Sequence, residues 1–205
     1  MPRSTARPSS SARGERTRSA IIRAAATVFA RHGYRGGPLA AVATEAAMTQ
    51  PGVLHHFASK EDLLMAVLEQ RDREGTRRLN ESSWADGGGA ALDALHDLVA
   101  HNGTTPELVQ MFTVLVGESV AADHPARAFF TDRYETLRFR TTRAVQRGQD
   151  SGEFRADADA ATLAALVLAV MDGLQIQWLL DPELDMATRF AVFVDMMKRF
   201  LAPPA

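Results

Sequence analysis

Apolar residues recur along most of this chain at intervals of three and four, and this periodicity constrains its fold more than any other feature. The clearest early case covers residues 17–32 and ends at Gly33, a residue that favours helix termination. The apolar positions of that segment are Ile21, Ile22, Ala25, Val28 and Phe29. No stretch shows sustained β alternation or a hairpin dipeptide between apolar runs. The sequence therefore predicts an all-α protein.

Capping residues divide the N-terminal part of this pattern into short helices. Gly37 and Pro38 suit the N-cap and first position of a helix over residues 39–46. Thr49 suits the N-cap of the next helix, over residues 49–56. Three closely spaced helices are therefore expected before the chain reaches residue 57.

Further along, Ser59 is expected to cap a fourth helix, with Asp62 at the capping-box position. A glycine-rich break at 86–89 follows. Beyond the break, proline and glycine signals delimit five more predicted helices, over residues 90–101, 105–122, 125–150, 157–180 and 186–201.

Charge is distributed very unevenly along the chain. Residues 1–60 contain nine Lys and Arg against two Glu, a net charge of +7. Residues 61–205 contain fourteen basic against twenty-three acidic residues, a net charge of −9. A basic end joined to an acidic body is typical of a module that binds a polyanion such as nucleic acid, although a solvated arginine-rich tail gives the same count.

Other features exclude several classes of protein. No cysteine is present, which excludes disulfides, thiolate zinc sites and thiol catalysis. The N-terminus is polar and arginine-rich, without the apolar segment of a secretory signal. The longest apolar run, residues 160–171, ends at Asp172 and is too short for a membrane span. We therefore expect a cytoplasmic protein that does not contact membranes.

The second and third short helices form a helix-turn-helix pattern. Residues 39–46 would be its first helix, Ala47 and Met48 its turn, and residues 49–56 its recognition helix. A recognition helix lies in the major groove of double-stranded DNA with its N-terminal residues at the base edges. Gln50 suits this place, because a glutamine amide can bond N6 and N7 of adenine together.

Five segments at fixed spacing surround this motif: IIRAA (21–25), FARHGY (29–34), VA (42–43), AAMTQ (46–50) and LHHFASKEDLL (54–64). Together they strongly resemble the TetR family of bacterial repressors over about residues 18–68. The resemblance implies that Thr49 and Gln50 contact bases or phosphates, and that His55, His56 and Lys60 contact phosphates. The predicted DNA-binding set is Thr49, Gln50, Pro51, Gly52, His55, His56 and Lys60.

Three positions depart from the family pattern. Ala47 stands where the family usually has a turn glycine, and alanine costs about 1 kcal/mol there if the position needs a positive φ. Leu54 replaces a common tyrosine, and Gly37-Pro38 replaces a hydroxyl cap, so two phosphate hydrogen bonds should be missing. The arginine-rich arm either enters the minor groove and compensates for these missing hydrogen bonds, or does not contact DNA.

Residues 1–15 lack apolar periodicity, which predicts a disordered basic arm. The resemblance implies two further parts, a helix-turn-helix domain (16–62) and a helical bundle for effector binding and dimerisation (63–205). Residues 90–122 contain no Lys or Arg, which favours a neutral or cationic hydrophobic small molecule as effector. The candidate pocket residues, each of which is equally compatible with a plain core role, are His101, Gln110, Met111, Phe112, Glu118 and Trp178.

The last two predicted helices are too apolar to be single surface helices. In the TetR family such a pair meets its symmetry mate, so we expect a homodimer. The candidate interface residues are Leu166, Val170, Phe193 and Met197.

The sequence thus predicts a sequence-specific transcriptional regulator, acting as a repressor that a ligand releases from a pseudo-palindromic operator. Two other classes stay open. An effector-independent architectural DNA-binding protein would have a solid core, and an enzyme would need converging acid, base or metal groups. No nucleophile elbow, phosphate loop, dinucleotide fingerprint or metal-ligand spacing is recognisable, so no catalytic residue, metal site or cofactor is predicted.

Overall fold

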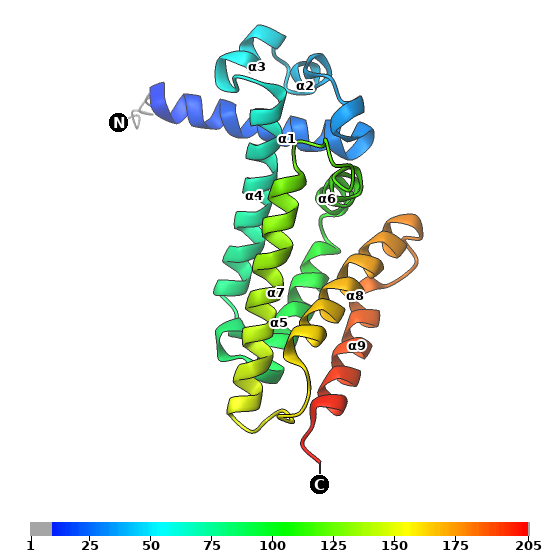
Figure 1. The fold of residues 1–205 in the computed structure, drawn as a ribbon. Coiled ribbons are helices and arrows are strands. Elements are labelled where there is room, and N and C mark those ends of the chain that lie inside the picture. The colour runs from blue at the N-terminus through cyan, green and yellow to red at the C-terminus, as the bar shows by residue number, and fades with distance from the viewer. Residues whose placement is uncertain (1–9, 205) are drawn as a thin grey trace, which may run out of the picture.

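The computed structural model describes residues 10–204, and this part of the chain is helical without strands (Figure 1). A short 3-10 turn, η1 (Ser83–Asp86), separates α4 from α5. The helices are α1 (Ser10–Gly36), α2 (Leu39–Glu45), α3 (Gln50–His56), α4 (Lys60–Asn80), α5 (Gly88–Asn102), α6 (Pro106–Glu118), α7 (Arg127–Asp150), α8 (Ala160–Leu180) and α9 (Met186–Leu201). The all-α prediction and the number and order of its helices are confirmed.

The first helix differs from its prediction at the N-terminal end. It begins at Ser10 rather than at residue 17, so the expected disorder of the arm is wrong for residues 10–15. Once the buried part of α1 is in place, each further residue adds a hydrogen bond at little cost, which favours extension. The arm's remaining residues, 1–9, lie outside the described part of the chain. Gly33 interrupts α1 with φ 67°, so the expected stop at this glycine is confirmed.

Two hydrophobic cores hold the molecule together. The head core joins α1, α2, α3 and the start of α4 to Met111 and Leu115 of α6, which are fully buried. The body core joins the end of α4 to α5, α7, α8 and α9 around Phe190 and Val167. In Figure 1 α6 lies beneath α1, and α4 runs from the head down into the body. These two helices therefore connect the two cores.

The predicted boundary between residues 62 and 63 falls inside the first turn of α4. The glycine-rich break at 86–89 separates α4 from α5 within the body core, where Gly87 and Gly88 both have positive φ. α6 ends at Glu118, earlier than the predicted residue 122, because the backbone beyond it forms turns, in which the Val120 and Ala121 amides donate to the carbonyls three residues earlier.

The α8 helix is unusually apolar. An 18-residue window of this 21-residue helix has a mean hydropathy of 1.7, enough by length and composition alone to cross a membrane. Here α8 packs against α6, α7 and α9, and Asp172 and Gln175 lie in its middle. These polar residues and the neighbouring helices fit a packed helix of a bundle better than a lipid-facing one.

Candidate DNA-reading head and ligand cavity

The third helix is positioned for reading DNA by one buried anchor and one side-chain cap. Val53 is fully buried in the head core. Thr49 is the N-cap, and its hydroxyl accepts a hydrogen bond of 3.2 Å from the Gly52 amide, as predicted. The rest of α3 projects outward at the end of the molecule opposite to α9 (Figure 1). The helix is therefore fixed at its start and free along its outer face.

The predicted DNA-binding residues lie on this outer face or beside it. Four of them are exposed, namely Thr49, Gln50, Pro51 and His55. Three are half-buried, namely Gly52, His56 and Lys60. The exposed side chain of Leu54, at the position of the family tyrosine, carries no hydrogen-bonding group. Their contacts with DNA stay predictions.

Lys60 begins α4 close to the recognition helix. The Ser59 hydroxyl caps this helix by accepting a bond of 2.9 Å from the Asp62 amide, which confirms the predicted cap. The Lys60 ammonium lies 4.5 Å from the centroid of the Tyr34 ring. Partial burial lowers the pKa of Lys60, and the nearby Glu118 carboxylate partly opposes that shift. A phosphate on Lys60 would supply a stronger counter-charge than the ring does.

Two details of the head were not predicted from the sequence. Pro38, not Gly37, is the N-cap of α2, and no side chain caps this helix. The missing hydroxyl cap is thus confirmed, although the expected cap position was one residue too early. The Arg18 guanidinium lies 4.7 Å from the centre of the Phe57 ring, where it adds an exposed positive charge beside α3.

The turn between α2 and α3 is strained as expected. Ala47 has φ 53°, and it is the one non-glycine residue with a positive φ in the described part of the chain. An alanine in this region pays about 1–2 kcal/mol that a glycine does not. The head therefore folds around an unfavourable residue at its sharpest turn.

We predict that Ala47→Gly stabilises the protein by about 0.5–1 kcal/mol, because the relief of strain exceeds the greater freedom that glycine has in the unfolded chain. Urea denaturation measures the difference. Ala46→Gly is the matched control, since Ala46 has φ −82° and should only lose stability. A loss of stability in Ala47→Gly would contradict the strain at this turn.

A polar cluster joins the head to the end of α6. The Tyr34 amide donates a bond of 2.7 Å to the Glu118 carboxylate, and the buried His124 ring lies 3.5 Å from the same carboxylate. The Ser119 hydroxyl contacts Nδ1 of His124 at 2.9 Å. Gly33 leaves room for the Glu118 carboxylate, since any Cβ at this glycine would overlap it. Movement of α6 is thereby tied to the kink in α1.

Within the body lies an inner cavity of about 70 Å³. Residues from α4, α5, α6, α7 and α8 enclose it, together with Trp84 of η1. The apolar residues of its lining include Leu79, Trp84, Leu95, Phe112, Leu168 and Met171. The polar residues of its lining include Arg71, Asp72, Arg133, Tyr134, Arg140, Asp172 and Gln175.

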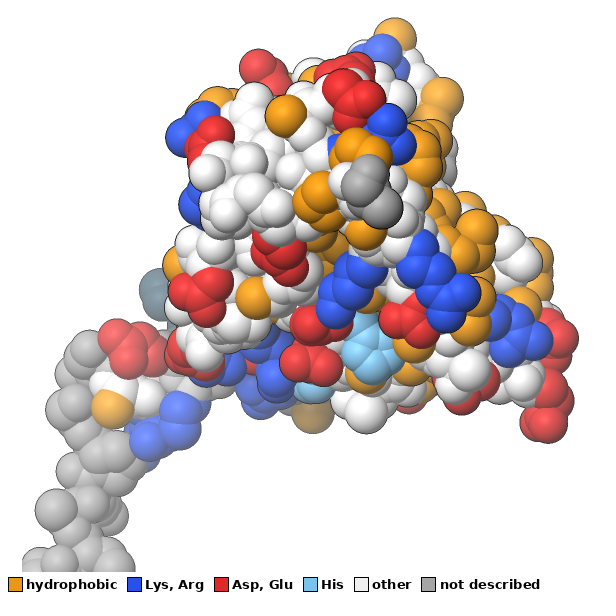
Figure 2. All heavy atoms as spheres, turned by 90° about the horizontal axis from the view of Figure 1, so that it is seen from below, with side chains coloured by type: hydrophobic (Ala, Val, Ile, Leu, Met, Phe, Trp, Pro, Cys, Tyr) orange, Lys and Arg blue, Asp and Glu red, His pale blue; other side chains and the backbone are white. Residues whose placement is uncertain are grey.

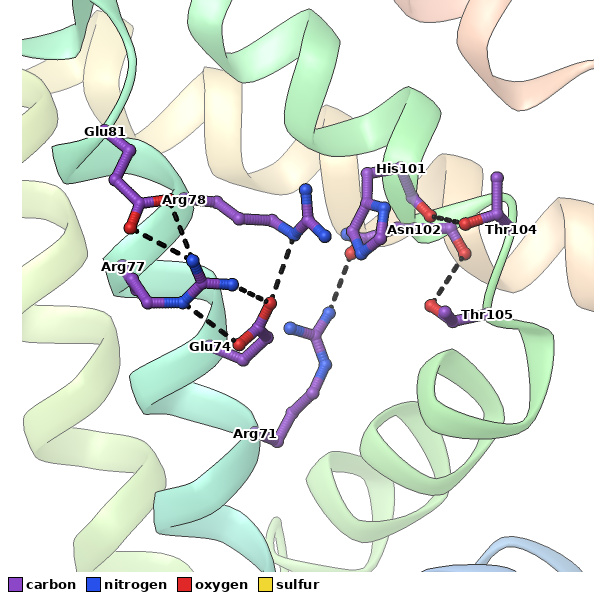
Figure 3. A network of polar contacts seen from close by, with 9 residues as sticks. All are labelled: Arg71, Glu74, Arg77, Arg78, Glu81, His101, Asn102, Thr104 and Thr105. Carbon is purple, nitrogen blue, oxygen red and sulfur yellow. Dashed lines mark hydrogen bonds and ion pairs between the residues drawn. The ribbon is translucent and has the colours of Figure 1, made fainter. Parts of the chain in front are cut away.

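A larger outer groove, of about 590 Å³, opens between the head and the body. It is lined by α1, α4, α5 and α6, and Arg71 and Asn102 line both it and the inner cavity. The Arg71 guanidinium donates a bond of 2.8 Å to the Asn102 side-chain oxygen, as Figure 3 shows. This pair therefore stands between the groove and the cavity.

Two pairs of polar residues in the cavity lining join neighbouring helices. Arg133 lies 3.1 Å from the Asp72 carboxylate, and its guanidinium is 4.8 Å from the Phe112 ring centre. The Tyr134 hydroxyl donates a bond of 2.6 Å to Asp172. Burial raises the pKa of Asp172 against the opposing effect of that bond, and burial also raises the pKa of Tyr134.

Comparison with known proteins matches both halves of this architecture. Residues 21–67 match the family described as bacterial regulatory proteins, tetR family. Residues 89–202 match the family described as BetI-type transcriptional repressor, C-terminal. The chain belongs to the TetR family of bacterial transcriptional regulators. It is a DNA-binding regulator and not an enzyme.

Among the TetR-family relatives, the HTH-type transcriptional regulator YfiR of Bacillus subtilis is 30% identical, with 78% of each chain covered. The HTH-type transcriptional repressor AcnR of Corynebacterium efficiens is 25% identical, covering 77% of this chain and 79% of the relative. The solved complex of triclosan with SmeT, the repressor of a Stenotrophomonas maltophilia efflux pump, shares the fold. It has a TM-score of 0.71 and 21% identity, over 89% of this chain and 90% of SmeT.

The residues predicted for the TetR-family ligand pocket are scattered in the structure. Phe112 lines the inner cavity, and His101 and Met111 line the outer groove. Gln110 is exposed, and Trp178 packs against the body core. The carboxylate of Glu118 bonds to the head instead of facing either space. Helical spacing could not distinguish these outcomes, because the facing elements were unknown.

Positive charge reaches the inner cavity from outside the segment on which the expected ligand charge was based. Residues 90–122 do lack Lys and Arg, but α4 supplies Arg71, and α7 supplies Arg133 and Arg140 to the inner cavity. None of these three arginines was a candidate on sequence grounds. Their side chains reach the cavity from helices that precede and follow the segment on which the expectation rested.

The candidate interface residues of α8 and α9 also differ in their exposure to solvent. Leu166 is exposed, Val170 and Phe193 are half-buried, and Met197 is buried within the body core. Met197 is therefore not free to meet another molecule. The interface candidates did not include the exposed α9 residues Val192, Met196 and Phe200 or the exposed α8 residues Ile176 and Leu180.

Proposed function

We propose that this TetR-family chain is a cytoplasmic homodimeric repressor that binds a pseudo-palindromic operator and leaves it when a hydrophobic small molecule enters the body. The observation that carries the proposal is the cavity inside the body, whose lining includes residues of α4 and α6. A solid core would have favoured the effector-independent architectural alternative. SmeT, which shares this fold, forms a complex with triclosan.

The homodimer is supported by the exposed apolar residues of α8 and α9. Val192, Met196 and Phe200 follow one another at intervals of four, so they form one stripe along α9. Leu166, Ile176 and Leu180 are exposed on α8. Seen from below, hydrophobic side chains gather along the side of the molecule on which Figure 1 places α8 and α9 (Figure 2). Continuous apolar surface of this kind favours an interface between identical chains.

Coupling between ligand and DNA would pass through α6 and α4. Phe112 faces the inner cavity from α6, while Met111 and Leu115 of the same helix are buried in the head core. A ligand that displaces Phe112 must therefore also disturb the packing of the head. Since α4 runs from the cavity to Lys60, a small shift of α4 changes the separation of the two recognition helices in a dimer. Such a change abolishes simultaneous contact with two half-sites.

The absence of Lys and Arg from residues 90–122 favoured a neutral or cationic hydrophobic ligand. We retain the hydrophobic body of that ligand, because apolar side chains make up a large part of the lining of the inner cavity. The charge preference no longer has support, because Arg71, Arg133 and Arg140 line the same cavity.

Selection of bound DNA from a random pool tests the proposed function. We expect enrichment of a two-fold symmetric sequence whose half-sites are about 10 bp apart or a multiple of this, with an even number of protomers on each duplex. Gel-shift assays then measure whether small molecules release the selected DNA. Binding without any enriched sequence would favour the architectural alternative and contradict a repressor.

We further predict that Glu118→Ala destabilises the protein by about 1.5–3 kcal/mol, because the Tyr34 amide loses a charged acceptor at a partly buried site. Chemical denaturation measures the change. Gln110→Ala on the same helix is the control, since Gln110 is exposed and lies apart from the polar cluster. Equal, small losses in both variants would mean that Glu118 does not hold α6 to the head.

A further inference from the structure

Arg71 is a largely buried cation without a carboxylate partner. Its hydrogen bond goes to a neutral amide, that of Asn102, and its Nε atom is buried with no acceptor. Within the described part of the chain no carboxylate lies within ion-pair distance of it. Burial lowers the pKa of Arg71 and the neighbouring Arg133 lowers it further, while the more distant charges of Asp72 and Glu74 partly oppose this shift. A guanidinium in such surroundings is stabilised by an incoming anion.

The nearby carboxylates are already engaged elsewhere. Glu74 lies one turn along α4 from Arg71, but its carboxylate is 2.7 Å from Arg77 and 3.4 Å from Arg78, as Figure 3 shows. Asp72 pairs with Arg133. Glu74 and Asp72 are therefore close to Arg71 in the sequence, but neither is its ion-pair partner.

Arg133, on α7, is a second arginine of the cavity with a buried donor that lacks an acceptor. Although it pairs with Asp72, its Nε is buried and has no hydrogen-bond acceptor. Asp172, which lines the same cavity, accepts a hydrogen bond from Tyr134. Two arginines of the cavity thus have buried donors without acceptors, whereas Asp72 is ion-paired and Asp172 is hydrogen-bonded.

We propose that the ligand is an amphipathic organic acid whose carboxylate binds Arg71 and Arg133 and whose apolar body lies against Phe112, Leu168 and Met171. This rests on the proposed function, in which a small molecule occupies the body. A carboxylate suits the site because each guanidinium can offer it paired N–H donors. Its single negative charge also balances the cavity lining, in which three arginines stand against two aspartates.

The dimensions of the two spaces indicate how such a molecule is accommodated. The inner cavity, at about 70 Å³, is smaller than the roughly 300–1,000 Å³ that ligand pockets usually enclose. The outer groove is about 590 Å³, and the Arg71–Asn102 pair separates the two. The carboxylate therefore replaces Asn102 as the acceptor for Arg71, which opens the cavity to the groove.

The test uses matched probes that differ in the head group alone. Decanoate, decanamide and decylamine form one set, and phenylbutanoate, phenylbutanamide and phenylbutylamine form another. Thermal shift and titration calorimetry on the full chain at neutral pH measure binding to each. We expect acids to raise the melting temperature and the corresponding amides and amines to bind at least about 30-fold more weakly, the effect of removing one partner of a buried charge pair.

Two variants test whether the stronger binding of acids depends on Arg71 and Arg133. Arg71→Gln and Arg133→Gln should each weaken binding of the acids by about 30-fold or more. Arg73→Gln on α4 is the matched control, because Arg73 is exposed and lies outside both spaces, and it should retain full affinity. Circular dichroism checks that each variant is folded, and the comparison of probes on the unaltered chain does not depend on the variants.

Stronger binding of the amines or amides, or no binding of either acid, would overturn the proposed ligand class. If the acids bind both arginine variants with unchanged affinity, the proposed site is wrong. Gel shifts with operator DNA in the same samples separate these failures from that of the proposed function. If an amine releases DNA, a ligand-controlled repressor remains and only its ligand class is wrong.

Discussion

Met196→Asp is expected to convert the protein from a dimer into a monomer at micromolar concentration and to weaken operator binding by about 100-fold or more. Met196 lies in the middle of the exposed stripe of α9, between Val192 and Phe200. A charge there has to be buried without a partner when two copies meet. Operator affinity falls because two linked heads bind a duplex about 10²–10⁴-fold more tightly than one head does. Light scattering and gel shifts measure the two effects.

Met196 is a sharper choice than the interface residues that the sequence suggested. Phe193 packs against Phe190, with ring centres 5.6 Å apart, so its substitution by Asp would also damage the body core. Phe139→Asp on α7 is the control, because Phe139 is similarly exposed but lies away from the stripe. A wild-type chain that is monomeric by light scattering would remove the basis of the dimer.

The difference between Met196 and Met197 shows what a sequence can and cannot determine. Both residues belong to an apolar helix that was predicted with its observed ends. One step along a helix turns a side chain by about 100°, which decides whether it faces the body core or the solvent. The direction of the core depends on the neighbouring helices, and periodicity within so apolar a segment does not define one face.

Local features of the head were predictable because they depend on residues close in sequence. The caps at Thr49 and Ser59 and the strained turn at Ala47 each involve a side chain and a backbone group within a few positions. The ligand cavity is different. Arg71 and Arg133 are far apart in the chain, and they line one cavity only because the folded bundle places α4 and α7 around it.

The same limit applies to the contact between the head and the body. Glu118 was a pocket candidate because it is a polar residue within an apolar segment. Its actual partner, the amide of Tyr34, is 84 positions away and becomes available only because Gly33 interrupts α1. A backbone amide carries no sequence signature, so the pattern of side chains could not indicate this bond.

Gln50→Ala and Lys60→Ala should weaken DNA binding in two distinguishable ways. Gln50 is exposed at the first position of α3, so its loss leaves the fold intact and removes a contact with one base pair. We expect a cost of about 1–3 kcal/mol on the selected operator, and little change on operators altered at that base pair. Lys60 would bind phosphate, so its loss should weaken binding to every sequence alike and reduce the salt dependence of log K by about 0.9.

Fluorescence anisotropy on the operator, on single-base variants and on random DNA over a range of salt concentrations separates the two effects. Lys60→Arg is a useful control, because it keeps the charge that binds phosphate. The Lys60 ammonium also lies over the Tyr34 ring, a contact of about 0.5–1 kcal/mol, so the stability of Lys60→Ala has to be measured alongside its binding. Equal losses on operator and random DNA for Gln50→Ala would contradict base recognition by Gln50. The reading of sequence would then have to come from Thr49 or His55, which are also exposed on α3 or at its N-cap.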